Sequence, residues 1–118
     1  MATRFELILD DAGKFHFQLR GPDGEVLLRS VGCDGKIKAQ TAMLHARSAL
    51  RDPQRSSAVA ASDGSHSIVA KEADGSMLAS SGRVADAMAA NELLQRIRSI
   101  SDTAPIIDLT KRRVGSAN

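Results

Sequence analysis

A pattern that recurs at an offset of 51 residues constrains the fold of this chain more than any other feature. Shifting the sequence by 51 places the turn dipeptide Asp23-Gly24 on Asp74-Gly75 without a gap. Two helical stripes of apolar residues also coincide after this shift, at Ala39, Ala42, Met43, Ala46 and Ala49 and at Ala90, Leu93, Leu94, Ile97 and Ile100. Unrelated helices rarely keep such a stripe in phase, so the sequence predicts a tandem repeat.

The first copy begins with segments in which apolar and polar side chains alternate, the period-2 signature of half-buried strands. These segments span residues 4–10, 14–20 and 25–30. Asp23-Gly24 lies between the last two and supplies the positive φ that a tight hairpin needs. Apolar spacings of three and four then predict a helix over 36–50.

Asp34 is a candidate N-cap for this helix, and Pro53 follows its end. The shift by 51 carries the same order of elements into the second copy. The predicted strands there span 57–61, 66–71 and 76–81, followed by a helix over 84–101 and a final strand over 106–109. The sequence therefore predicts two β-β-β-α units and one closing strand.

The core of this protein has to be mostly aliphatic. The 118 residues contain no Trp and no Tyr, and the three Phe all lie within the first 17 positions. Such a core buries less apolar area per residue, so we expect the two halves to share one core. We therefore expect a first repeat at 1–53 and a second at 54–110, forming one compact pseudo-two-fold domain, and a disordered basic tail at 111–118.

Charge and cysteine content narrow the classes of function. The formal net charge is only +2, although the sequence pI is about 9.0, and such an average neither shows nor excludes the concentrated basic patch of a nucleic-acid-binding protein. The single cysteine, Cys33, excludes an intramolecular disulfide. No apolar run approaches a membrane span and no leader is recognisable. We expect a cytoplasmic protein without membrane contact, metal site or cofactor.

Several segments resemble the YegP-like family of small bacterial proteins of unknown function. The resemblance covers roughly residues 4–110 and rests on Phe5-Glu6-Leu7, on Gly13-Lys14-Phe15-His16-Phe17-Gln18-Leu19, on Asp23-Gly24-Glu25-Val26-Leu27-Leu28-Arg29-Ser30, and on Ala104-Pro105-Ile106-Ile107-Asp108-Leu109-Thr110. It implies an α+β fold with one antiparallel sheet, two helices on one face, and C-terminal strands exchanged between the repeats. The family brings no established reaction, ligand or catalytic residue.

One candidate ligand site lies on the polar face of the second strand. His16, Gln18 and Arg20 alternate with apolar residues and share that face. Mixed polar groups there fit an anionic ligand, or equally a solvated face with cross-strand ion pairs. The remaining histidines, His45 and His66, have no partner at the spacing of a metal site. His45 is expected to be exposed and inert.

Basic residues form a second candidate site, for nucleic acid or another anion. They lie near the ends of the two helices and in the tail, at Arg47, Arg51, Arg96, Arg98, Lys111, Arg112 and Arg113. Arginines equivalent by the repeat could contact successive phosphates. The structural alternative is that they complement helix C-termini and shield a thin core.

Catalytic patterns are missing from the sequence. Cys33 precedes a helix, where a thiol can be activated, but no base can be assigned to it. We therefore expect a protein that is not an enzyme but a non-catalytic binding or scaffold module, acting through protein–protein contacts or self-association. The alternatives are weak nucleic-acid binding and, last, an enzyme that uses Cys33 or a histidine.

Overall fold

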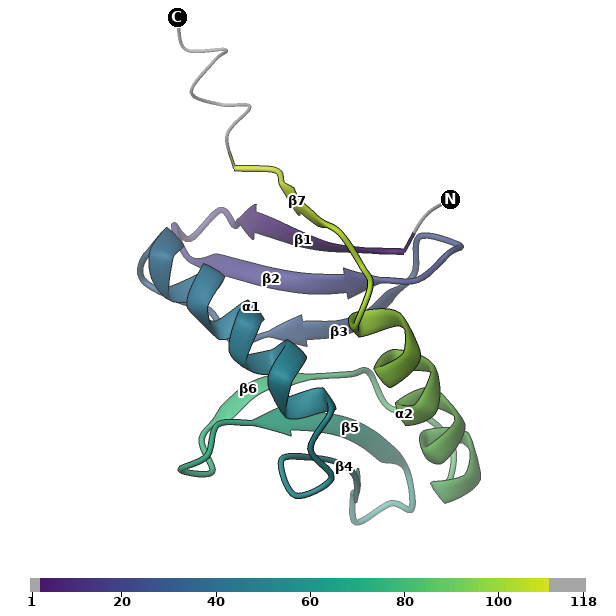
Figure 1. Cartoon of the computed structure of the whole chain (residues 1–118). Helices are drawn as coiled ribbons and strands as arrows, with labels where there is room; N and C mark the ends of the chain where they lie inside the picture. Colours follow the sequence, from purple (N-terminus) through teal and green to yellow (C-terminus); the bar gives the residue numbers. More distant parts are fainter. Residues whose placement is uncertain (1–2, 111–118) are drawn as a thin grey trace, which may run out of the picture.

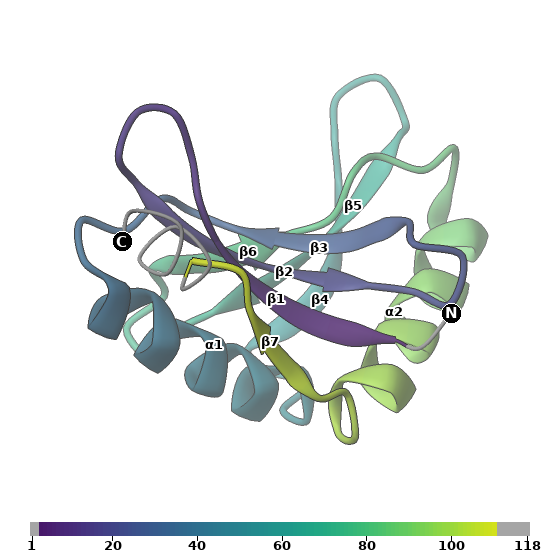
Figure 2. The same cartoon turned by 90° about the horizontal axis from the view of Figure 1, so that it is seen from above.

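The computed structural model describes residues 3–110, which form one mixed sheet of seven strands with two helices on one of its faces (Figures 1 and 2). The strands are β1 (Arg4–Leu9), β2 (Phe15–Arg20), β3 (Val26–Ser30), β4 (Ser56–Ala60), β5 (His66–Lys71), β6 (Met77–Ser80) and β7 (Ile106–Asp108). The helices are α1 (Lys36–Leu50) and α2 (Ala87–Ser101). The expected tail at 111–118 lies outside the described residues.

The strand order across the sheet is β4-β5-β6-β3-β2-β1-β7. Strands β1 to β6 pair in antiparallel fashion, but β7 is parallel to β1, so a wholly antiparallel sheet was the wrong expectation. The cause is the place at which β7 joins the sheet. The chain leaves β6, passes through α2 over the helical face, and enters the sheet beside β1 (Figure 1), so that β7 runs opposite to β6 but in the same direction as β1.

Pairings within the two halves of the sheet recur 51 residues apart. The matching pairs are Phe5–Leu19 and Ser56–Ala70 in the hairpins, and Phe15–Cys33 and His66–Val84 in isolated bridges. The halves meet where β3 pairs with β6, and there Arg29 lies opposite Ser80, which follows it by 51 residues. The outer edges differ, because β1 has β7 beside it.

One continuous core fills the space between the sheet and the helices. Its two aromatic residues, Phe5 and Phe17, meet edge to face with ring centroids 6.2 Å apart. Leu50 of α1 and Ile97 of α2 are fully buried in the same cluster. Alanines on the buried faces of both helices let the helices approach the sheet closely, which suits a chain with few large apolar side chains.

The N-cap of α1 and the start of α2 differ from expectation. Gly35, which has no side chain to form a capping hydrogen bond, occupies the N-cap of α1, and the carboxylate of Asp34 pairs with Lys14. α2 begins at residue 87 rather than 84, since Val84 is held in its extended bridge. Asp86 is the N-cap there, and its side chain accepts a hydrogen bond from the backbone of Ala89 at 2.9 Å.

The other observed bounds agree with the predicted ones to within one residue. Neither helix of the described region is long and apolar enough to cross a membrane.

Leu28 tests the position of the core. It lies fully buried on β3 at the centre of the sheet, so Leu28→Ala is expected to lower the free energy of unfolding by about 2–5 kcal/mol. Urea unfolding followed by circular dichroism measures the change. The exposed Val26 of the same strand gives the control, and Val26→Ala should change stability by about 0.5 kcal/mol or less. Equal losses in both variants would contradict this core.

Candidate functional site

The helix-free face of the sheet carries the first candidate site. Figure 2 shows the β1–β2 and β4–β5 turns rising on this side, opposite the two helices. His16, Gln18 and Arg20 share this face, since they alternate with the core residues Phe17 and Leu19. The three polar side chains do not converge on one point. They belong to two separate clusters.

Gln18 and Arg20 both turn to Glu6 on the neighbouring strand β1. The Glu6 side chain accepts hydrogen bonds from Arg20 Nε at 2.6 Å, Gln18 Nε2 at 2.8 Å and Arg4 Nε at 2.8 Å. Only 5% of Glu6 is exposed. Burial opposes its negative charge, but the bonds from Arg20, Gln18 and Arg4 outweigh that effect and lower its pKa below the ordinary value of 4.5.

The negative charge of Glu6 is therefore balanced within the sheet, which leaves Gln18 and Arg20 committed to a carboxylate of the protein itself. Sequence reasoning missed this, because alternation gives the face of a residue but not its partner across the strands. The register supplies the missing information, since Glu6 lies directly opposite Gln18.

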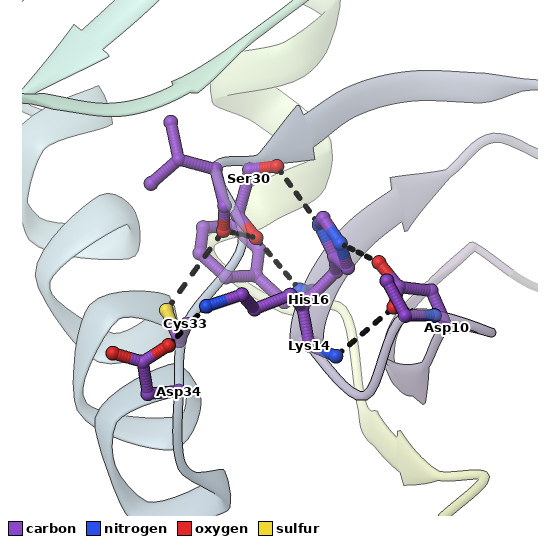
Figure 3. Close-up of polar contacts among 9 residues, drawn as sticks. Asp10, Lys14, His16, Ser30, Cys33 and Asp34 are labelled. Atoms are coloured by element: carbon purple, nitrogen blue, oxygen red, sulfur yellow. Dashed lines mark hydrogen bonds and ion pairs between the residues drawn. The ribbon is translucent and has the colours of Figure 1, made fainter.

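His16 forms the second cluster with Asp10 and the end of β3 (Figure 3). Its Nε2 lies 2.6 Å from Asp10 Oδ2, and its Nδ1 lies 3.2 Å from the carbonyl oxygen of Ser30. The Asp10 pKa is lowered by hydrogen bonds from the backbone of Lys14 and from His16. A side chain at Gly32 would come within 3.3 Å of the His16 ring, so glycine allows this close packing. The cluster ties the β1–β2 turn to β3.

The Cys33 thiol lies apart from the His16 ring and does not form a thiol–imidazole pair with it (Figure 3). Its Sγ lies 3.8 Å from the carbonyl of Val31, and Figure 3 shows it beside Asp34, apart from the His16 ring. The Ser30 hydroxyl is also engaged, since it accepts from the backbone of Phe17 and donates to the carbonyl of Val31. Residues 3–110 contain no group of three or more His, Cys, Asp or Glu side chains able to hold a metal ion. His45 is exposed as expected, but it contacts Glu72 at 2.9 Å.

The helix arginines make contacts inside the protein. The Arg47 guanidinium lies 5.1 Å from the centre of the Phe5 ring and donates to the carbonyl of Ala104, which follows α2. Arg98, which is equivalent by the offset of 51, donates from Nε to the carbonyl of Leu50 at the end of α1, at 3.0 Å. Each helix thus supplies a cation to carbonyl groups at the end of the other.

The other two predicted arginines are paired with carboxylates. Arg51 Nε contacts Asp102 Oδ1 at 2.7 Å, and these two residues are themselves 51 positions apart. Arg96 pairs with Glu25 in the β2–β3 turn. The structure therefore favours the structural reading of these four arginines. Lys111, Arg112 and Arg113 lie outside the described residues.

An apolar groove opens between α1 and β7. It has a volume of about 330 Å³, and its lining consists of Leu7, Gln40, Met43, Leu44, Ile106 and Asp108. The rim of α1 is strongly apolar, since Ile37 is 77% exposed and Leu44 is 56% exposed. Sequence reasoning missed the groove, although the spacing of seven between Ile37 and Leu44 places both on one face of α1, outside the stripe that packs on the sheet.

Lys36 neutralises Asp108, the acidic residue that lines this groove. Its Nζ lies 2.7 Å from Asp108 Oδ2. Burial opposes the charge of Asp108, but hydrogen bonds from Lys36 and Thr110 lower its pKa to about 2. The groove is therefore apolar in its walls and neutral at its rim.

Comparison with known proteins gives a fold but no activity. No family model matches the chain, and no curated protein matches it. The solution structure of YegP from E. coli, a protein of unknown function, is similar with a TM-score of 0.84 and 25% identity over 92% of this chain and 94% of that chain. A UPF0339 protein from Shewanella oneidensis is similar with a TM-score of 0.83 and 22% identity over 92% of both chains.

The resemblance to the YegP-like family is confirmed. The likeness to YegP extends over the whole sheet and both helices, since it covers nearly all of each chain. Because YegP itself has no assigned activity, the function of this chain has to be argued from its own surfaces.

Glu6→Gln tests the buried carboxylate. Because the pKa of Glu6 is lowered in the folded protein, its charge contributes stability above about pH 4.5, and this contribution is lost as the pH falls through the lowered value. The variant is expected to lose about 1–3 kcal/mol at pH 7, with a smaller loss near pH 3. Urea unfolding at both pH values measures this, with Glu92→Gln on the exposed side of α2 as the control. A loss that does not change with pH would contradict the role of the ionised carboxylate.

Proposed function

We propose that this protein is a non-catalytic binding module that associates with a second copy of itself at the α1–β7 end of the sheet. The observation that carries the proposal is the apolar groove beside a strand that has no neighbour on its outer side within residues 3–110. Both features lie at the same end of the molecule. A partner that supplies a strand and aliphatic side chains would fit both together.

The module is built, in this proposal, by internal duplication. Residues 1–53 and 54–110 are two copies of one β-β-β-α unit, and β7 of the second copy is exchanged onto the first. Two facts support this: strand pairings recur at an offset of 51, and β7 follows α2 in sequence yet pairs with β1.

Two hydrogen bonds define which groups of β7 are free to pair. Phe5 N donates to Pro105 O at 2.8 Å, and Leu109 N donates to Leu7 O at 3.0 Å. These bonds direct the odd-numbered residues of this segment toward β1, because backbone groups alternate in direction along a strand. The N–H and C=O groups of Ile106 and Asp108 therefore point outward.

A second copy matches this edge. An antiparallel contact around a two-fold axis at Ile107 sets Ile106 opposite Asp108 of the second copy, so that donors meet acceptors on both sides. The groove offers no net charge to attract an oppositely charged partner, since Lys36 and Asp108 neutralise each other. Self-association therefore fits better than a charged ligand.

Nucleic-acid binding is the weaker candidate. Its arginine version needs free guanidinium groups, whereas Arg47, Arg51, Arg96 and Arg98 are engaged with carbonyl groups or carboxylates of the protein. Phosphate binding would have to compete with these contacts.

Leu44→Gln tests self-association. The residue equivalent to Leu44 in α2 is Gln95, so the change copies a side chain that the chain already uses at the matching position. The wild type is expected to sediment as a dimer at about 100 μM, and the variant as a monomer with stability changed by about 0.5 kcal/mol or less. Met77→Gln, at a similarly exposed methionine on β6, should stay dimeric. A monomeric wild type, or a dimeric Leu44→Gln variant, would overturn the proposal.

The absorbance of the purified protein separates the two candidates. Without Trp and Tyr the protein absorbs little at 280 nm, so bound nucleic acid would dominate the spectrum. Purification at low salt is expected to give only the weak absorption of the three Phe in this region of the spectrum. A strong 260 nm band that high salt removes, and that returns on mixing at low salt, would favour the nucleic-acid candidate instead.

A further inference from the structure

We infer that the free edge of β4 is a docking site for an extended, uncharged aliphatic segment of a partner protein, which adds to the sheet parallel to β4. The inference rests on the internal duplication in the proposed function but not on self-association. It concerns the opposite end of the sheet from β7 (Figure 1).

The two outer edges of the sheet are covered unequally. β1 and β4 are equivalent by the offset of 51, as their matching pairs with β2 and β5 show. β1 receives β7 along its outer side, whereas β4 pairs within residues 3–110 with β5 alone. The connections explain the difference. After α2 the chain leads to β7, but after α1 it leads directly into β4, so the fold has one strand too few to cover both edges.

The free pairing groups of β4 can be identified from its ladder with β5. Lys71 N donates to Arg55 O at 2.8 Å, and Ala61 N donates to Ser65 O at 2.7 Å. The odd-numbered residues between them therefore face β5, and the even-numbered ones face outward. Ser56 is already occupied, since its N–H donates to Asp52 and its carbonyl accepts from Arg98.

The outward N–H and C=O groups of Ala58 and Ala60 thus remain available to a partner. β4 also lacks the features that protect exposed edges in other sheets. Its sequence, Ser-Ser-Ala-Val-Ala, contains no charge and no proline, and its pairing with β5 is regular from end to end. The small side chains of Ala58 and Ala60 allow another backbone to approach closely. The edge is therefore suited to strand addition rather than protected from it.

β7 serves as the template for the occupant. In the β1–β7 pairing, Leu7 lies opposite Asp108, and Ala58 takes the place of Leu7 after the shift by 51. The charge beside the added strand differs between the two sites. Lys36 pairs with Asp108, but the residue equivalent to Lys36 is Ala87, which offers no charge to an acid. The segment at β4 should therefore be neutral where β7 has its aspartate.

The source of the segment is a different protein. The β7 strand of a second copy already directs the backbone groups of Pro105, Ile107 and Leu109 to its own β1, so it cannot pair with β4 in the way that it pairs with β1. Exposed Met88 of α2, equivalent to Ile37 of α1, gives the new strand an apolar neighbour on the helical side. The partner thus presents an extended stretch with alternating aliphatic residues.

A peptide that copies β7 provides the probe. We would titrate the ¹⁵N-labelled full chain with residues 102–110 carrying Asp108→Asn, and follow backbone amides by NMR. The expected result is a saturable shift of the Ala58 and Ala60 amides, with about 10-fold slower hydrogen exchange at Ala58. No saturable change at up to about 5 mM peptide, or changes confined to Phe5 and Leu7 of β1, would overturn the inference.

Two controls separate strand addition from other contacts. The same peptide with Ile107→Pro lacks the N–H that β7 directs to its neighbour, so it should not bind. In the protein, Ala58→Pro removes an outward N–H, which an edge strand tolerates, and should abolish binding while the spectrum stays dispersed. Binding that survives both changes would overturn the inference.

The titration is repeated in Leu44→Gln to keep the two proposals apart. Self-association and strand addition use opposite ends of the sheet, so the peptide is expected to bind this variant as it binds the wild type. Peptide binding in a wild type that proves monomeric would support the β4 site and reject self-association. A dimeric wild type that ignores the peptide would do the reverse.

Discussion

The pairing of β3 with β6 is the contact on which the rest of the structure depends. Each half has only three antiparallel strands and a helix rich in alanine, which is too little to enclose a core alone. Joining the halves edge to edge creates one sheet wide enough for both helices to pack on, and Leu28 and Ala79 of the joining strands are fully buried beneath them. Few large side chains suffice because the core is shared.

The joining of the two halves at β3 and β6 also explains why the helix arginines bind groups within the protein. When two helices lie on one face with their C-terminal ends near each other, unpaired carbonyl groups gather in one place. Arg47 and Arg98 donate to these groups across the boundary between the halves, and Arg51 pairs there with Asp102. These arginines are candidates for phosphate contacts in the sequence, but in the folded protein they contact carbonyl groups or a carboxylate of the chain itself.

The sequence predicted the elements well and their partners poorly. Alternation and an Asp-Gly turn located the strands of the first copy, because these signals are local, and the offset of 51 carried them into the second copy. The N-cap of α1 was wrong because Asp34 has a distant partner in Lys14, and the start of α2 was wrong because Val84 pairs with His66.

The parallel pairing of β7 depends on which strand it joins, and the Glu6 cluster depends on the register of β1 and β2, so neither can be predicted from a single segment. For the same reason the candidate face at His16, Gln18 and Arg20 was found as a face but not as two clusters, and the groove beside α1 was not found.

The parallel pairing of β1 with β7 has a mechanical consequence. The two strands lie side by side and run in the same direction, so Arg4 stands at the start of one and Leu109 beyond the end of the other. A force that pulls these two points apart drags the strands past each other along their length. All the hydrogen bonds between them then bear load together, instead of opening one after another like a zip. The strand that closes the sheet therefore also acts as its shear clamp.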